Sequence, residues 1–183
     1  MNYSEIKTFD IANGIGVRTS LFVSGCRNKC PGCFNSETWD FNSGKKFTQE
    51  TINYILKTLE PDYIDGLSIL GGEPLEPENQ TDILNLVRQV KSEYPDKDIW
   101  LWTGFTWHDI FFNINCRACA IPSHAIMYAI DVLVDGPFEE DKKNLLLRFA
   151  GSENQRIIDV KKSLEDGHIV EWLDDPVFAK HSW

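Results

Sequence analysis

The chain has 183 residues and a formal net charge of −10 at pH 7, with 42% hydrophobic and 25% charged residues. This composition excludes a disordered or low-complexity protein, and the length fits one domain with its own hydrophobic core. The acidic excess disfavours nucleic acid and anionic membrane surfaces as partners.

Residues 1–10 lack the apolar core of a secretory signal and contain Glu5 and Asp10. The longest apolar stretch is interrupted by Pro122, His124 and Asp131. It therefore falls short of the roughly 20 residues that a membrane helix needs. We expect a cytoplasmic protein without a membrane partner.

Short predicted strands alternate with helices. Apolar, β-branched or aromatic runs predict buried strands at 19–23, 67–70, 99–102, 132–134 and 156–160. One helix is predicted after a cap at Thr48, and a second ends before Pro95. The alternation implies parallel strands joined by crossovers. Four or five such strand–helix units predict an α/β fold, namely an open, partial β/α barrel of mainly parallel strands. In such a fold the functional residues gather at the carboxyl ends of the strands.

The first cysteine cluster follows the strand at 19–23. Cys26, Cys30 and Cys33 form a C-x3-C-x2-C motif, and the chain has five cysteines in two clusters. An odd number in an intracellular-looking chain favours metal ligation over disulfides. Structural zinc and buried four-iron clusters usually take four protein ligands, so three thiolates would leave one metal position open. Two alternatives stay open, namely three cysteines without a metal and a zinc site completed by a distant histidine.

Glycine and polar residues follow the later strands. Gly71 and Gly72, with Glu73 and Pro74, end the strand at 67–70, and the glycines allow a ligand to approach the backbone closely. A plain strand-to-helix turn is the alternative. Further residues at the ends of the later predicted strands belong either to a functional site or to turns: Thr103, Gly104, Asp135, Gly136, Pro137, Ser152, Asn154, Gln155 and Arg156.

A second cysteine pair, Cys116 and Cys119, lies near His108 and His124. Two sulfur and two nitrogen ligands could bind zinc, but the loose histidine spacing favours two reduced thiols.

Two basic residues, Arg27 and Lys29, lie between the cysteines of the first cluster. They are either solvated surface charges or a patch that steers an acidic electron donor.

Several motifs together carry a family resemblance. The cysteine spacing resembles the cluster loop of the radical S-adenosylmethionine superfamily. The ordered segments NGIGVRTSLFVSGCRNKCPGCFNSETWDF, LGGEP, LWTGF, DVLVDGPF and GSENQR resemble the anaerobic ribonucleoside-triphosphate reductase-activating proteins. The resemblance implies a radical S-adenosylmethionine partial-barrel domain over residues 1–160. Residues 161–183 would form a C-terminal extension, either a packed helix or a loose tail.

The resemblance implies an oxidoreductase whose 4Fe-4S cluster is held by Cys26, Cys30 and Cys33. The fourth iron would bind the amino and carboxylate groups of S-adenosyl-L-methionine. One electron would cleave the sulfonium, and the 5′-deoxyadenosyl radical would take a hydrogen atom from a glycine of the anaerobic reductase. The protein itself would supply positioning and electronic tuning.

The resemblance also implies cofactor contacts at Gly71, Gly72 and Glu73, which would bind the amino group of S-adenosylmethionine. Beside Cys33, Gly32 would allow close backbone approach, and Phe34 would either provide an apolar or stacking surface or belong to the core.

The chain lacks the extra cysteines of larger activases, so its electron would come from a flavodoxin-like or ferredoxin-like protein. Two alternatives stay open. One is activation of another glycyl-radical enzyme or a small molecule, and the other is a non-enzymatic zinc or iron-sulfur module.

Overall fold

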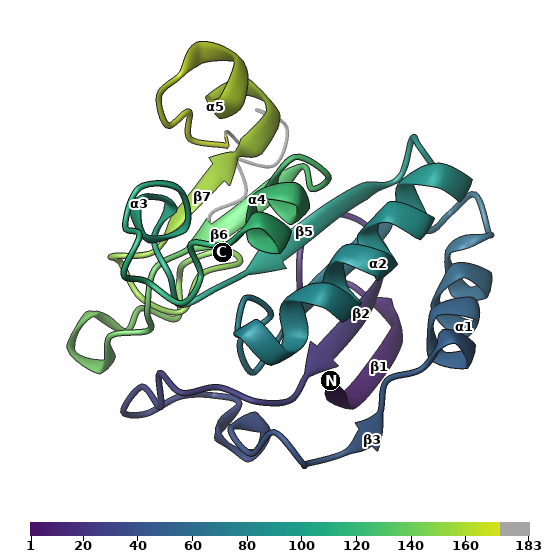
Figure 1. The fold of residues 1–183 in the computed structure, drawn as a ribbon, viewed down its shortest axis with the longest axis horizontal. Coiled ribbons are helices and arrows are strands. Elements are labelled where there is room, and N and C mark those ends of the chain that lie inside the picture. The colour runs from purple at the N-terminus through teal and green to yellow at the C-terminus, as the bar shows by residue number, and fades with distance from the viewer. Residues whose placement is uncertain (173–183) are drawn as a thin grey trace.

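The computed structural model describes residues 1–172 and contains one open, seven-stranded sheet (Figure 1). The strand order is β3-β1-β2-β4-β5-β6-β7. The strands are β1 (Asn2–Asp10), β2 (Arg18–Val23), β3 (Lys45–Lys46), β4 (Gly66–Gly71), β5 (Asp98–Trp102), β6 (Val132–Asp135) and β7 (Arg156–Asp159). Because β3 and β7 lie at opposite ends of this order, the sheet is not closed into a barrel.

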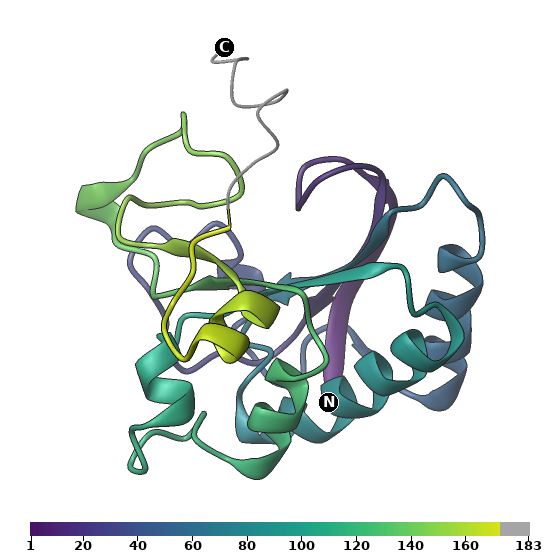
Figure 2. The same ribbon diagram turned by 90° about the horizontal axis from the view of Figure 1, so that it is seen from above.

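Helices α1, α2 and α4 cover one face of the sheet (Figures 1 and 2). The helices are α1 (Gln49–Leu59), α2 (Pro77–Glu93), α3 (Trp107–Phe111), α4 (Ile121–Met127) and α5 (Val160–Asp166). The predicted cap of α1 is confirmed, because the Thr48 side chain accepts a hydrogen bond from the Thr51 N–H. The prediction that α2 ends before Pro95 is confirmed as well.

The five predicted strands are present, but their directions differ in part from the prediction. Strands β2, β4, β5 and β6 are parallel neighbours, whereas β7 is antiparallel to β6. The connection 136–155 contains only a 3-10 helix, Glu140–Lys142, so it does not form the long crossover that a parallel strand requires. The structure thus has three parallel crossovers instead of four or five. Strands β1 and β3 were not predicted, and Val160 begins α5 instead of ending β7.

The sheet buries a different set of side chains on each face. Leu67 and Ile69 of β4 belong to the main core, together with residues of α1 and α2. Trp100, Val132 and Val134 form a second, smaller core. The alternation along each strand fixes the register, because successive side chains point to opposite faces.

Residues after β7 return to the sheet as far as the structure describes them. The Trp172 N–H donates to the Ile157 carbonyl at 2.9 Å, and the Trp172 ring centroid lies 4.9 Å from that of Trp100. Residues 173–183 of the predicted C-terminal extension lie outside the described residues. Between residues 1 and 172, no helix combines the length and apolar character needed to span a membrane.

Asp131 joins three elements, and Asp131→Asn is expected to lower the free energy of unfolding by about 2 kcal/mol at pH 7. Its carboxylate accepts from Lys91 of α2 (2.7 Å), the Ile99 N–H of β5 (2.8 Å) and Lys161 of α5 (2.5 Å). Burial acts to raise the pKa of Asp131, yet hydrogen bonds from Lys161 and Lys91 outweigh it and hold the pKa below its ordinary value.

Because the folded pKa of Asp131 is the lower one, its stabilisation is present above the unfolded pKa of about 4 and is lost as the pH falls through the folded pKa. Urea unfolding at pH 7 and pH 3 measures this effect, and the difference between Asp131→Asn and wild type should shrink at pH 3. The exposed Asp62 provides the control variant, Asp62→Asn. A cost that does not change with pH would contradict the assignment.

Candidate functional site

Three cysteines lie on one loop at the carboxyl edge of the parallel strands. The segment 24–44 leaves β2 and runs along the lower left of Figure 1. Cys26 is buried, Cys30 and Cys33 are half-buried, and all three are free thiols. The loop turns sharply, since Lys29 has φ 46° and Gly32 has φ 70°. The predicted trio of thiols is therefore presented together on a tightly curved segment.

The residues after the loop fix its two ends. The Gly25 N–H donates to the Thr38 carbonyl at 2.7 Å, and the Cys26 N–H donates to the Trp39 carbonyl at 3.1 Å. The Asn35 N–H points to the sulfur of Cys33 at 3.4 Å. The 35–39 segment therefore has a structural function at the base of the cysteine loop.

Burial raises the pKa of Cys26 to about 11, and the charge of Glu73 adds to this, whereas the backbone N–H groups of Asn28 and Lys29 oppose it. Burial also raises the pKa of Cys30, with the Phe138 N–H acting in the opposite direction. Without metal these two groups are protonated at neutral pH, so ligation would release protons.

Within residues 1–172, no three or more histidine, cysteine or acidic side chains are arranged around a position for a single metal ion. A zinc ion at the first cysteine cluster would therefore require its ligands to move together. In a four-iron cluster each cysteine binds a different iron, so the sulfurs need not converge on one point. The three thiols on one loop are thus a donor set that fits an iron-sulfur cluster.

The glycines after β4 allow two loops to touch. The Gly72 N–H donates to the Val23 carbonyl at 2.8 Å, and the Glu73 N–H donates to the Gly25 carbonyl at 2.9 Å. A Cβ on Gly71 would lie 2.7 Å from the Val23 nitrogen, and one on Gly72 would lie 2.7 Å from the Gly25 oxygen. The close approach of the two backbones therefore requires glycine at both positions.

Glu73 is buried and joins the loops after β4 and β5. Its Oε1 accepts from the Thr103 hydroxyl at 2.7 Å and the Leu75 N–H at 3.0 Å, and its Oε2 accepts from the Gly104 N–H at 2.7 Å. Burial raises the pKa of Glu73 to about 7, although these donors counteract the effect. Since protein donors surround the carboxylate, the backbone of the segment is left as the part that can contact a ligand.

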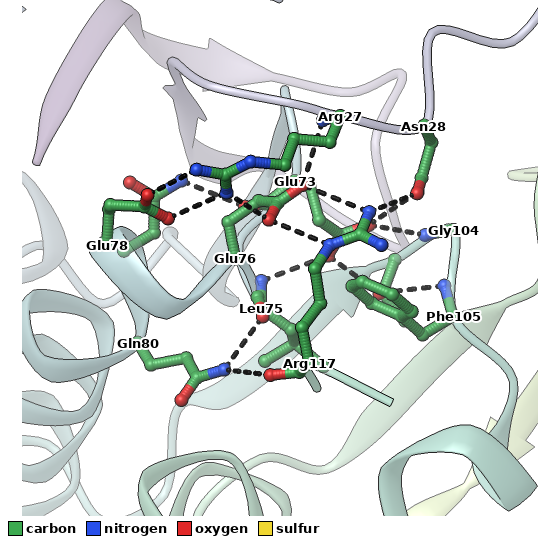
Figure 3. A network of polar contacts seen from close by, with 12 residues as sticks. Arg27, Asn28, Glu73, Leu75, Glu76, Glu78, Gln80, Gly104, Phe105 and Arg117 are labelled. Carbon is green, nitrogen blue, oxygen red and sulfur yellow. Dashed lines mark hydrogen bonds and ion pairs between the residues drawn. The ribbon is translucent and has the colours of Figure 1, made fainter. Parts of the chain in front are cut away.

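Arg27 is engaged in ion pairs. Its guanidinium lies 2.7 Å from the buried Glu76 and 2.5 Å from Glu78 (Figure 3). The guanidinium also faces the Phe41 ring at 4.5 Å. Arg27 is therefore an exposed charge that is paired with two carboxylates, and its contribution to a donor-steering patch is largely neutralised. Lys29 is also exposed, and it forms no ion pair within residues 1–172.

Phe34 and Gly32 face the connection after β6. Phe34 is 56% exposed, and its ring centroid lies 5.2 Å from that of Phe138. The Lys143 ammonium lies 4.8 Å from the centroid of Phe34. A Cβ on Gly32 would lie 2.7 Å from Glu140 Oε1. Phe34 is consequently an exposed aromatic beside Cys33 and not a core residue.

The polar residues around β6 and β7 mainly build turns. The Glu139 N–H donates to the Ser152 hydroxyl at 3.2 Å, the Asn154 amide donates to the Pro137 carbonyl at 2.7 Å, and the Gln155 amide donates to the Gly136 carbonyl at 3.0 Å. These contacts fit the turn alternative for Ser152, Asn154 and Gln155.

A cavity of about 420 Å³ opens beside these turns, and its lining includes His108, Asp135 and Arg156. Asp135 is buried, and it accepts hydrogen bonds from the Trp107 N–H at 2.8 Å and from Arg156 Nε at 2.9 Å. Both contacts fix the end of β6 at the carboxyl edge.

Around the second cysteine pair, no third histidine, cysteine or acidic side chain within residues 1–172 completes a group that could hold a metal ion. His124 Nε2 lies 2.7 Å from the Ile110 carbonyl and 3.9 Å from the sulfur of Cys119. Cys116 and Cys119 are free and half-buried. The expectation of two reduced thiols stays a prediction.

Arg117 and Glu76 belong to the site although sequence reasoning did not single them out. Arg117 Nε donates to Glu76 Oε2 at 2.9 Å, and Arg117 Nη2 donates to Asn28 Oδ1 at 2.6 Å (Figure 3). The one local signal was the position of Arg117 between Cys116 and Cys119.

Comparison with known proteins gives two kinds of match. A family model described as a 4Fe-4S single cluster domain matches residues 12–158. Curated relatives named anaerobic ribonucleoside-triphosphate reductase-activating protein include one from Enterobacteria phage T4, 41% identical over 86% of this chain and 93% of the relative. Relatives with the same name from Vibrio cholerae and Escherichia coli K12 are each 43% identical, over 86% and 85% of this chain and 97% and 96% of their own lengths.

Proposed function

The chain belongs to the family of anaerobic ribonucleoside-triphosphate reductase-activating proteins, and we propose that it activates such a reductase by forming a glycyl radical on it. One observation carries the proposal. The loop with three free thiols lies directly against the Gly71–Gly72 segment at the carboxyl edge of the parallel strands. This edge is where α/β folds bind ligands and perform chemistry.

In this proposal Cys26, Cys30 and Cys33 hold a 4Fe-4S cluster and leave one iron without a protein ligand. When bound, the cluster supplies the electron that cleaves S-adenosyl-L-methionine, so that the 5′-deoxyadenosyl group can take a hydrogen atom from a glycine of the reductase. The chain's own residues curve the loop, bury Cys26 and direct the Asn35 N–H group toward the sulfur of Cys33. Such N–H groups tune cluster potential.

S-adenosylmethionine would contact the loops that flank the cysteines. The backbone of Gly71 and Gly72 is the proposed partner of its amino group, with Glu73 acting indirectly by joining this segment to Thr103 and Gly104. Phe34 supplies an exposed aromatic surface for the adenine, and Gly32 allows close approach of the backbone. The role of Glu73 thereby changes from a ligand contact to a support of the ligand-binding segment.

The remaining assignments belong to the same proposal. The open sheet with four parallel central strands supports a radical S-adenosylmethionine type of partial barrel over residues 1–160, with an extension over 161–183. We place the protein in the cytoplasm, with a flavodoxin-like or ferredoxin-like protein as its electron donor.

The test is to mix the anaerobically reconstituted, reduced protein with its host's reductase and S-adenosylmethionine. A glycyl radical doublet in electron paramagnetic resonance spectra is expected only when all components are present. Methionine and 5′-deoxyadenosine should form in the same mixture. Cleavage without a doublet would point to another target, and the absence of cleavage would leave a non-enzymatic module.

A further inference from the structure

Arg117 reaches the cysteine loop from a distant part of the chain. It lies between α3 and α4, yet its Nη2 donates to the Asn28 side chain, 89 residues earlier, at 2.6 Å. The Gln80 amide donates to the Arg117 carbonyl at 3.2 Å, and the guanidinium lies 4.6 Å from the Phe105 ring centroid. Both contacts hold Arg117 in the orientation drawn in Figure 3.

Glu76 provides the buried anchor for this contact. Its side chain is fully buried, and both oxygens accept from Arg117, at 2.9 and 3.1 Å. The same carboxylate accepts from the Arg27 N–H at 2.8 Å and from the Arg27 guanidinium at 2.7 Å. A buried carboxylate requires such partners, so the two arginines and the loop backbone are fixed together.

The residues held in this way are adjacent to the first cysteine. Arg27 directly follows Cys26 and donates its backbone N–H to Glu76 at 2.8 Å, and Asn28 is the next residue. Moving Asn28 would therefore displace the backbone that follows Cys26, including its N–H groups. N–H groups near cluster sulfurs help to set the reduction potential.

We propose that Arg117 is a positioning residue for the cluster loop, because it ties Asn28 to the buried Glu76 and so fixes the backbone around the sulfur of Cys26. The inference rests on the proposed function and assigns a role to a segment that otherwise supplies only a pair of thiols. Arg117 itself does not contact the cysteines. It acts through Asn28 and Glu76.

The first test uses the metal-free full-length protein under anaerobic conditions. Alkylation of Cys26 by iodoacetamide, followed by mass spectrometry, measures how often the loop opens. Arg117→Ala and Asn28→Ala should each accelerate alkylation of Cys26 by about tenfold, because local opening controls access to a buried thiol. Arg117→Lys should restore part of the protection. Arg88→Ala, on the exposed side of α2, is the matched control and should behave like wild type.

The second test compares the midpoint potential of the reconstituted cluster in the same variants. We expect the midpoint potential to shift in Arg117→Ala and Asn28→Ala and to stay at the wild-type value in Arg88→Ala. A merely structural role of Arg117 would not shift this potential. Hydrogen exchange at the backbone amides of Ile69 and Leu101 reports whether the core has loosened. If Arg117→Ala does not fold, the alkylation rate and midpoint potential of Asn28→Ala decide whether the proposal holds.

The inference and the proposed function fail in different ways. Suppose that Cys26 is alkylated in Arg117→Ala and Asn28→Ala at the same rate as in Arg88→Ala, and that the midpoint potential is unchanged. This result would overturn the role of Arg117 and leave the proposed function intact. Failure of wild type to assemble a cluster would contradict the proposed function, and alkylation would still decide whether Arg117 fixes the loop.

Discussion

Replacing Cys30 with alanine is expected to abolish cluster assembly and, with it, glycyl radical formation on the reductase. Cys30 is half-buried at the centre of the loop, and the Cys33 N–H donates to its carbonyl at 3.1 Å. Removing its sulfur leaves two thiols on the loop for a four-iron cluster, which normally requires more protein ligands. Iron content after anaerobic reconstitution and the radical doublet should both fall to background. Because the substitution removes one half-buried atom, unfolding stability should change by less than about 1 kcal/mol.

Cys119→Ala is the matched control for this prediction. Cys119 is also a free, half-buried thiol, but it belongs to the pair between α3 and α4. Iron content and radical yield should remain at the wild-type level in this variant. Wild-type iron content in Cys30→Ala would contradict the assignment of the ligands. Equal iron loss in both variants would instead place the second pair in metal binding.

Local patterns explain which elements could be predicted. The buried strands β4 and β5 are continuous apolar runs, and the Thr48 cap has a short-range signature. Strand β1 was missed because its residues are mostly half-exposed and polar ones interrupt the apolar pattern. The direction of β7 was predicted incorrectly because alternation of strands and helices was extended to a connection that contains no long helix.

The site shows the same division between local and distant signals. The cysteine spacing is a local motif, and it indicated the loop on which the thiols occur. The contacts of Glu73 with Thr103 and of Arg117 with Asn28 join residues 30 and 89 positions apart. No periodicity or spacing encodes such pairs, since they depend on how β4, β5 and the α3–α4 connection meet at one edge. Sequence reasoning therefore identified Glu73 as a candidate but not its internal partners.

Gly72→Ala is expected to weaken binding of S-adenosylmethionine by roughly 10- to 100-fold, with most of the cluster still assembled. The added Cβ would lie 2.7 Å from the Gly25 oxygen and 3.1 Å from its carbonyl carbon. These are backbone atoms and cannot rotate away, so the two loops must separate. Gly25 directly precedes Cys26, and the movement would displace the cysteine loop relative to the backbone proposed to bind the amino group.

Gly167→Ala separates this steric effect from general destabilisation. Gly167 caps α5 with φ 70°, so alanine there strains the backbone by about 1 kcal/mol, but its Cβ would meet no atom within 4 Å. Titration of the reduced cluster with S-adenosylmethionine, followed by electron paramagnetic resonance, should show weaker binding for Gly72→Ala alone. Wild-type affinity in Gly72→Ala would mean that the close contact between the loops does not shape the cofactor site. If Gly72→Ala and Gly167→Ala lose affinity to a similar extent, the loss arises from lower stability, because only Gly72→Ala forces the two loops apart.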